Sequence, residues 1–251
     1  MKIATYNVWN SECGMPNRLQ CVIDEILAAD ADVICLQEVR DRAMAEEIAG
    51  RAGYSHCCFD SDNHEERGLF ILSRIPFTEC ESRIGAANAI CCSFSWKDRI
   101  WSVVNLHLPW DSVMEREKQI VSIVSAIDGK QSDYICMAGD FNCLDTSDVH
   151  RFLTGDCLLN GKEANPRWFD LALAYAELTD SAAECTLDFR RNPRFVNNTI
   201  ELNARYDRIL LKNTYPKEFP ILKSCITFGQ TVYESIDLAA SDHYGVVAEL
   251  E

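Results

Sequence analysis

The chain alternates between two hydrophobic patterns, and each pattern predicts a different kind of element. Short apolar runs rich in β-branched residues are typical of buried strands. They occupy residues 2–9, 32–39, 68–74, 89–96, 100–108, 134–141, 205–212 and 244–251. Apolar residues at helical spacing predict helices over 17–29, 41–52 and 113–128. Strands interleaved with helices in this way predict a layered α/β architecture.

The order of these elements repeats once along the chain. An early strand, helix and strand lead to the sequence QEV, and a later strand, helix and strand lead to GDFN. Two similar halves are expected to pack as two sheets face to face, with helices outside. No Pro-, Gly- or Ser-rich linker interrupts the sequence, so residues 1–251 are predicted to form a single domain.

The stretch 160–203 is less regular than the rest of the chain. It contains the cluster Arg190, Arg191 and Arg194, and its apolar residues show no clear period. We therefore expect a loop-rich region that carries specificity.

Composition and charge narrow the class of protein. Hydrophobic residues make up 47% of the chain and charged residues 25%, as in globular proteins. No apolar run approaches the ~20 residues of a membrane helix. The N-terminus lacks an export signal, so an intracellular, cytoplasmic protein is expected. The formal net charge of −15 disfavours tight binding to duplex nucleic acid unless Lys and Arg gather on one face.

The 13 cysteines contain no CxxC pair, so the spacing of a zinc finger is absent. Several of them, such as Cys35 and Cys136, lie in apolar strand-like runs. Cysteines in such runs behave as small hydrophobic residues, and we expect reduced, mostly structural thiols.

Polar side chains stand at or near the ends of the predicted strands. They are Asn7, Glu38, His107, Asp140, Asn142, Asp207, Asp242 and His243. Any one of them alone is more often a turn or cap residue, but a buried polar group is costly without a partner. One cleft in which they pair with each other, a metal and a substrate satisfies all of them. The pattern predicts an active site built from strand ends.

These residues fall in the ordered motifs TYNxW, LQEV, NLHL, GDFN, YDRI and SDHYGV. Together the motifs resemble the endonuclease/exonuclease/phosphatase superfamily over nearly the whole chain. HEERGLF, HLPWDSVMEREKQI and ARYDRILLK are similar to the 5′-tyrosyl-DNA phosphodiesterase branch, and LQEVRD and ERGLFIL to deoxyribonuclease I. The resemblance implies a four-layered α/β sandwich of two mixed β-sheets. It also implies phosphoester hydrolysis with Mg²⁺, for which Mn²⁺ can substitute.

The resemblance further assigns roles to the polar residues. It puts the magnesium ion on Glu38, with Asn7 and Asp242 completing or supporting the metal shell. Oxygen ligands of this kind are those that Mg²⁺ prefers. Asp140 orients or deprotonates the attacking water, and Asn142 donates to a phosphoryl oxygen.

The imidazoles take the remaining roles. His243 contacts the phosphate, and Asp207 binds its other ring nitrogen and fixes its orientation. Whether Asp140 or His243 is the general base stays open. His107 resembles a general acid oriented by Glu66, although Glu66 is equally well explained as an exposed loop acid.

The expected function is that of a monomeric, divalent-metal-dependent phosphodiesterase acting on DNA or RNA ends or adducts. The arginine cluster favours this function, and the net charge counts against it. One alternative is a phosphatase or phosphodiesterase of small-molecule or lipid phosphoesters, of the inositol phosphate or sphingomyelin type. Another is a relative that binds without catalysis, which the filled catalytic positions disfavour. Trp9, Trp110 and Trp168 are expected to pack within the protein.

Overall fold

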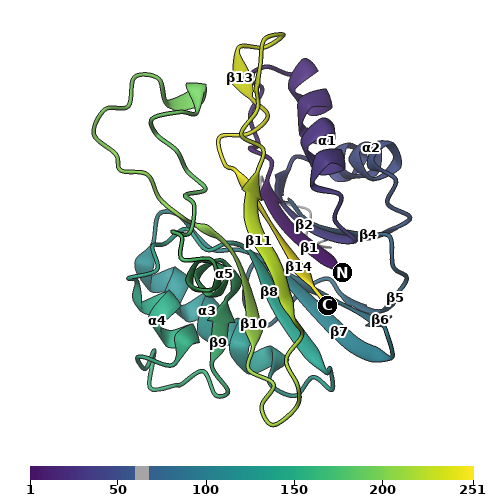
Figure 1. The fold of residues 1–251 in the computed structure, drawn as a ribbon, viewed down its shortest axis with the longest axis vertical. Helices are drawn as coiled ribbons and strands as arrows, with labels where there is room; N and C mark the ends of the chain where they lie inside the picture. The colour runs from purple at the N-terminus through teal and green to yellow at the C-terminus, as the bar shows by residue number, and fades with distance from the viewer. Residues whose placement is uncertain (60–67) are drawn as a thin grey trace.

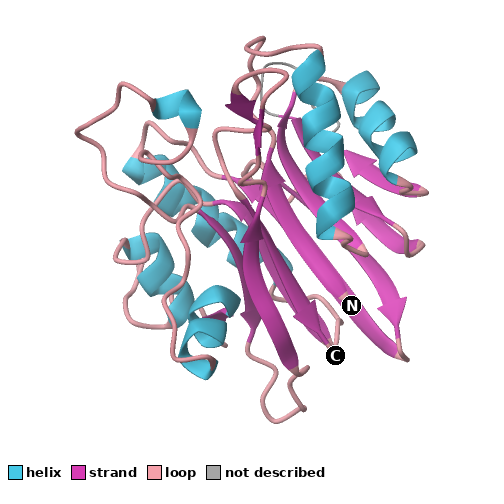
Figure 2. Ribbon diagram, turned by 45° about the horizontal axis from the view of Figure 1, so that its top comes forward, coloured by secondary structure: helices cyan, strands magenta, loops and turns pink. Residues whose placement is uncertain are grey.

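The computed structural model describes residues 1–59 and 68–251. Within these residues, two six-stranded sheets pack face to face, with helices on their outer faces (Figure 1 and Figure 2). Sheet A consists, in spatial order, of β11 (Leu222–Phe228), β14 (Gly245–Leu250), β1 (Lys2–Asn7), β2 (Val33–Val39), β4 (Gly68–Ser73) and β3 (His56–Phe59). Sheet B consists of β5 (Phe77–Glu81), β6 (Ala89–Trp96), β7 (Arg99–His107), β8 (Tyr134–Asp140), β10 (Asp207–Lys212) and β9 (Trp168–Asp170).

The helices of the described residues are α1 (Asn17–Ala29), α2 (Arg42–Ala52), α3 (Val113–Ile127), α4 (Asp148–Thr154), α5 (Leu171–Leu178) and the 3-10 helix η1 (Pro193–Phe195). Apolar side chains of α1 and α2 pack on sheet A, and those of α3 and α4 pack on sheet B. Helix α5 lies against β10 and β11, and a small sheet pairs β12 (Val232–Tyr233) with β13 (Leu238–Ala239) (Figure 1). Among the described residues, no helix is long and apolar enough to cross a membrane.

The predicted α/β sandwich of two sheets is confirmed. The early strand–helix–strand unit is β1-α1-β2 in sheet A, and the later one is β7-α3-β8 in sheet B. Every predicted strand and helix is present, with ends shifted by a few residues. The prediction of an irregular stretch over 160–203 is wrong in part, because β9 and α5 form there.

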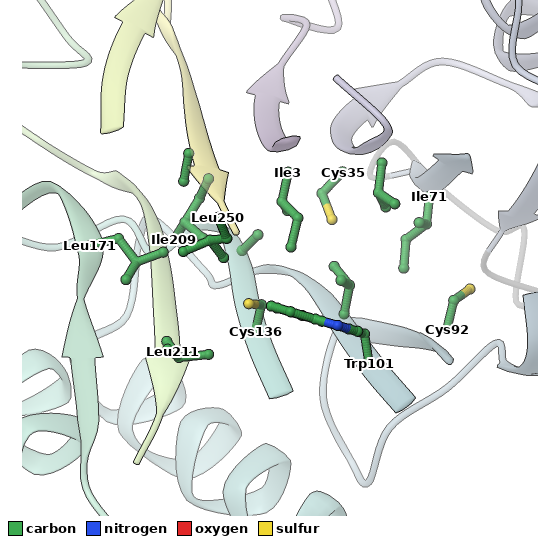
Figure 3. Packing of buried hydrophobic residues seen from close by; sticks show 14 of the residues in the cluster. Ile3, Cys35, Ile71, Cys92, Trp101, Cys136, Leu171, Ile209, Leu211 and Leu250 are labelled. Atoms are coloured by element: carbon green, nitrogen blue, oxygen red, sulfur yellow. The ribbon is translucent and has the colours of Figure 1, made fainter. Parts of the chain in front are cut away.

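The core lies in three layers because the main strands are buried on both faces. On β2, Cys35 points into the space between the sheets, whereas Ile34 and Leu36 face the helices. Figure 3 shows the inner layer, to which Cys35 and Cys136 contribute from opposite sheets. Both cysteines are fully buried, as expected for small hydrophobic residues. Burial on both faces also explains why these strands read as continuous apolar runs.

Strand direction brings the polar strand ends together. Strands β1 and β2 are parallel, with Asn7 beside Gln37, and β7 and β8 are parallel, with His107 beside Asp140. Strands β14 and β10 run antiparallel to β1 and β8, so each of them begins where its neighbour ends. The carboxyl ends of four strands and the starts of two others therefore meet at one end of the sandwich.

Candidate active site

Three predicted site residues occupy neighbouring positions on three adjacent strands of sheet B. Asp140 on β8 pairs in register with His107 on β7 and with Asp207 on β10. All three side chains are buried. The His107 Nε2 atom lies 3.6 Å from Asp140 Oδ2. The sheet register alone therefore brings an imidazole and two carboxylates together.

Gly139 makes the close pairing of β7 and β8 possible next to these residues. Its φ is 147°, and a Cβ at this position would overlap the Leu106 carbonyl oxygen. Only glycine fits such a backbone position without displacing the neighbouring strand. The glycine of GDFN thus sets the spacing between His107 and Asp140.

Glu38 reaches the site through an irregularity in sheet A. The pairing of β2 with β4 shifts register between Leu36 and Val39, and Glu38 has a positive φ of 58°. A bulge of this kind turns a side chain away from its regular direction. The Glu38 carboxylate accepts hydrogen bonds from the Asn10 backbone at 2.9 Å and from Asn7 Nδ2 at 3.0 Å. Its side chain is 26% exposed, so it remains open to solvent.

The bulge is supported by Asn105, a residue that the sequence motifs do not single out. Asn105, on β7 of sheet B, donates from Nδ2 to the Leu36 and Phe70 carbonyl oxygens, at 2.9 Å each. Its Oδ1 accepts from Gln37 Nε2 at 2.7 Å. Asn105 is fully buried and bridges the two sheets beneath Glu38. The signal in the sequence is weak, since it is one polar residue inside an apolar strand.

Asn7 joins the two halves of the site. Its Nδ2 donates to Glu38 and also to Asp140 Oδ2 at 3.1 Å. Its Oδ1 accepts from the Trp9 backbone at 3.0 Å. Asn7 therefore holds the Glu38 carboxylate of sheet A beside the Asp140 carboxylate of sheet B.

The predicted contact between Asp207 and His243 is present. His243 Nδ1 lies 2.8 Å from Asp207 Oδ2, and its Nε2 lies 3.9 Å from Asp140 Oδ2. Burial by itself disfavours the imidazolium, but the Asp207 and Asp140 carboxylates outweigh it and hold the pKa of His243 well above its usual value. Ser241 fixes the turn before β14, since its hydroxyl donates to the Asn7 carbonyl at 2.7 Å and accepts from the His243 backbone at 3.2 Å.

Asp242 is half-buried next to His243 and interacts electrostatically with Glu38. Burial raises the pKa of Asp242 to about 6, and the Glu38 carboxylate adds to this effect, against the lowering by His243 and Arg194. The acidic groups that crowd together at this point create a negatively charged site, which a cation neutralises.

Asn142 is held close to Asp140 by a tight turn. Its φ is 49°, its backbone donates to Asp140 Oδ1 at 2.8 Å, and its Nδ2 donates to the Leu108 carbonyl at 2.9 Å. An amide nitrogen carries two hydrogens, so a second donor remains for a ligand.

The donor set fits a hard divalent cation. Ligand atoms of Asp140, Asp207 and His243 lie within 4.8 Å of one another. Among the described residues, the buried Asp207 Oδ1 has no hydrogen-bond partner. The carboxylate oxygens among these ligand atoms suit Mg²⁺ or Mn²⁺. The carboxylates of Glu38 and Asp242, which interact electrostatically with each other, supply further oxygen ligands.

One prediction concerns a residue before β4. Glu66 lies outside the described residues, so its proposed contact with His107 stays a prediction. Within the described part of the chain, the buried His107 Nδ1 has no hydrogen-bond partner.

The arginines of the cluster lie in different environments. Arg194 stacks on the Trp9 ring, with its guanidinium carbon 5.2 Å from the ring centroid. Asn192 anchors this loop to the site by donating to the Ser241 and Asp242 carbonyls, at 2.9 and 3.3 Å. Arg190 instead binds backbone carbonyls of its own loop.

The three tryptophans also differ from one another. Trp168 is buried, as predicted, and Trp9 is half-buried between arginines. The prediction that Trp110 packs within the protein is wrong, because its side chain is 72% exposed. The loop after β7 turns it outward, where Arg116 binds the carbonyls of Pro109 and Trp110.

Comparison with known proteins gives one family and a set of similar folds. The model of the Endonuclease/Exonuclease/phosphatase family matches residues 4–243. No curated protein matches the sequence. TDP2 from D. rerio, solved with a single-stranded DNA product, has a TM-score of 0.76 and 18% identity, over 100% of this chain and 98% of that one.

Two bacterial structures are similar to the same degree. A functionally unknown conserved protein from Enterococcus faecalis V583 has a TM-score of 0.74 and 18% identity, over 100% of this chain and 99% of that one. The endonuclease/exonuclease/phosphatase from Bacteroides vulgatus has a TM-score of 0.74 and 17% identity, over 100% of this chain and 98% of that one. At these identities the similarity demonstrates a shared fold.

Proposed function

The chain belongs to the Endonuclease/Exonuclease/phosphatase family, and from that membership we propose a divalent-metal-dependent phosphodiesterase that acts on nucleic-acid ends or adducts. One observation carries the proposal. The Asp207–His243 pair faces Asp140 at one end of the sandwich, and Asn7 links Asp140 to Glu38. This arrangement joins an acidic, metal-fitting site to a fixed imidazole.

Glu38 and Asp242 are the proposed ligands of Mg²⁺, with Mn²⁺ as a substitute. Asn7 supports them, because its N–H donates to Glu38 and fixes the direction of the carboxylate. The bound cation would neutralise charge on the phosphoryl oxygens and act as a Lewis acid.

The remaining residues position the substrate and the attacking water. Asp207 fixes the ring of His243 through Nδ1, so that Nε2 faces Asp140 and the phosphate. A water between Asp140 and His243 is held for attack. Asp140 can remove its proton, and His243 can do so only in its neutral form. Asn142 donates to a phosphoryl oxygen through its second N–H. His107 is the proposed general acid for the leaving oxygen.

Arg194 supports a nucleic-acid substrate. It lies against the Trp9 ring, acts electrostatically on Asp242 and presents a cation to the edge of the site. Phosphate binds cations, so this arginine suits the backbone of a nucleic-acid end. The TDP2 structure from D. rerio holds a single-stranded DNA product, which agrees with this substrate class.

A panel of substrates tests the proposal. Turnover with Mg²⁺ is measured on a 5′-phosphotyrosyl oligonucleotide, a plain duplex, an inositol phosphate and a sphingomyelin analogue. Cleavage of the oligonucleotide adduct, abolished by EDTA and restored by Mg²⁺ or Mn²⁺, is expected. Cleavage of only the last two substrates would show that the site serves small-molecule or lipid phosphoesters.

Two variants test the assigned residues. Glu38→Ala and His243→Ala are each expected to lower kcat by about 10²–10⁴-fold, the usual contribution of a positioned acid, base or ligand. Glu115→Ala, at a half-exposed position on α3, is the matched control and should retain full activity. Unchanged activity in both site variants would rule out the mechanism and favour binding without catalysis.

A further inference from the structure

Three cysteines from three strands meet at the open side of the sandwich, outside the candidate active site. Cys58 lies on β3, Cys80 on β5 and Cys92 on β6. Strand β3 is the last strand of sheet A and β5 is the last strand of sheet B, and the two edges lie against each other. The three Sγ atoms are all within 4.8 Å of one another.

The three side chains converge from both sheets. Cys80 and Cys92 are cross-strand partners in sheet B, and their Sγ atoms are 3.5 Å apart. Cys58 reaches them from sheet A. Cys58 and Cys92 are buried, and Cys80 is exposed. Cys92 lies at one end of the core between the sheets, near Ile71 (Figure 3).

We propose that Cys58, Cys80 and Cys92 bind one thiophilic metal ion, such as Zn²⁺, that cross-links the two sheets. A tetrahedral zinc ion with Zn–S bonds of about 2.3 Å separates its thiolate sulfurs by roughly 3.8 Å. The distance of 3.5 Å between the Cys80 and Cys92 sulfurs already lies close to that value. Cys80 faces solvent, so a water molecule can take the fourth position. The three thiol protons are released to solvent as the metal–sulfur bonds form.

A metal site accounts for the cluster better than a disulfide does. A disulfide needs sulfurs about 2.05 Å apart and uses only two of the three cysteines. A soft metal uses all three thiols at their present spacing.

Cobalt(II) distinguishes this site from the catalytic one. Co²⁺ replaces Zn²⁺ in tetrahedral sites, and a thiolate-to-cobalt charge-transfer band appears only when sulfur is a ligand. The carboxylates and imidazoles of the active site give no such band. The protein is reduced with a phosphine, which does not compete for the metal as a thiol does, and is then titrated with Co²⁺. One equivalent is expected to produce the band.

Single variants identify the ligands. Cys80→Ser is expected to lose the band, and Cys92→Ala is the second variant, since alanine leaves no buried hydroxyl. Cys157→Ser is the matched control, because this thiol lies after α4 and outside the cluster, and it should keep the band. Circular dichroism establishes that each variant is folded.

Thermal unfolding gives a second readout. Zn²⁺ at about 100 times its dissociation constant is expected to raise the Tm of the parent protein and of Cys157→Ser by about 5–10 °C, and not that of Cys80→Ser. Absence of the cobalt–thiolate band in the reduced parent protein would overturn the proposal. So would an equally intense band in both cluster variants.

Discussion

Glu38, Asn142 and Gly139 show that the site depends on unusual backbone conformations at single residues. Glu38 and Asn142 both have positive φ, which residues with a Cβ adopt at a cost of about 1–3 kcal/mol. Such strain persists only where surrounding contacts enforce it. Here Asn7 and Asn10 hold the Glu38 carboxylate, and Asp140 and Leu108 hold Asn142. Each strained residue aims a functional group into the site.

Gly139→Ala is expected to damage both stability and activity. The new Cβ would collide with the Leu106 carbonyl and push β8 away from β7 beside His107. We expect unfolding free energy to fall by about 2–4 kcal/mol. Turnover should fall about 10²-fold, because small displacements misalign reacting groups. Urea unfolding and steady-state kinetics measure the two effects. Gly129→Ala, with nothing within 4 Å of the new Cβ, is the control and should match the parent.

The sequence identifies the site residues more readily than their supports. Asp207 and His243 stand out because a charged residue at the end of an apolar strand is rare and costly. Asn105 and Ser241 act through a bulge and a turn. A hydrogen bond from sheet B to a carbonyl in sheet A depends on tertiary packing, which no short motif encodes.

At the scale of elements, the bulge in β2 and strand β7 form one unit. The register shift that aims Glu38 also interrupts the ladder between β2 and β4 near Leu36 and Phe70. Asn105 satisfies both carbonyls. Buried backbone groups require such partners, so the bulge and Asn105 depend on each other.

Asn105→Ala is expected to lower the unfolding free energy by about 2–4 kcal/mol, since it leaves two buried carbonyls and Gln37 Nε2 short of partners. It should also lower kcat, because Glu38 loses its support. Chemical denaturation and kinetics are the measurements. Asn197→Ala, at an exposed loop position, is the control for stability. A variant as stable and active as the parent would show that water replaces the amide.

A buried charge network supports β9, β10 and α5 behind the site. Asp170 accepts hydrogen bonds from Arg205 and from the start of α5, and contacts His150 and Arg208. Burial alone would raise the pKa of Asp170, but the His150 contact and the two arginines hold it below its usual value. Asp170 therefore stabilises the fold above the carboxyl pKa of the unfolded chain, and this contribution is lost as pH falls.

Asp170→Asn is expected to lower the unfolding free energy at pH 7 by about 3–5 kcal/mol, because it leaves buried arginines without a counter-charge. The difference from the parent should shrink as pH falls below about 4. Urea unfolding of both proteins across this pH range measures the difference in unfolding free energy. Asp148→Asn breaks a half-exposed ion pair with Arg151 and should change stability by less than about 1 kcal/mol. A constant difference at all pH values would contradict the assignment to charge.

Four of the strands absent from the prediction share a place in the fold. Strands β3, β5, β9 and β11 lie at the edges of the sheets. Strands β3 and β9 are only four and three residues long, and β5 and β11 carry several exposed residues, so their apolar pattern is weak. Helix α5 follows β9 in an apolar run without a clear period, which hides the boundary between them.

At the scale of the molecule, a net charge of −15 opposes a polyanion. A nucleic-acid substrate must therefore be held by local contacts at the site, among which Arg194 is the best placed. Broad electrostatic attraction along a duplex is not expected from this surface.

Arg194→Ala is expected to raise the KM for a 5′-phosphotyrosyl oligonucleotide by about 5–10-fold, with little change in kcat. Lengthening the oligonucleotide beyond about six nucleotides should leave KM nearly constant. Arg191→Ala, an exposed neighbour on the same loop, is the control. Equal effects of the two substitutions would indicate a general effect of charge.

The cysteine cluster shows what sequence spacing cannot reveal. The absence of CxxC correctly excludes zinc-finger spacing. Cys58, Cys80 and Cys92, however, meet only because two edge strands, both hidden in the sequence pattern, close the same side of the sandwich.

The division of the site between two sheets has a mechanical consequence. Asn7, Glu38 and His243 are carried by strands of sheet A or their ends, whereas His107, Asp140 and Asp207 belong to sheet B. A slide of one sheet over the other by about 1 Å would separate proton donors from acceptors and cost about 10²-fold in rate. The rate of turnover thus measures how well the two sheets are aligned. Core substitutions that repack the interface between the two sheets without loss of stability should still slow catalysis.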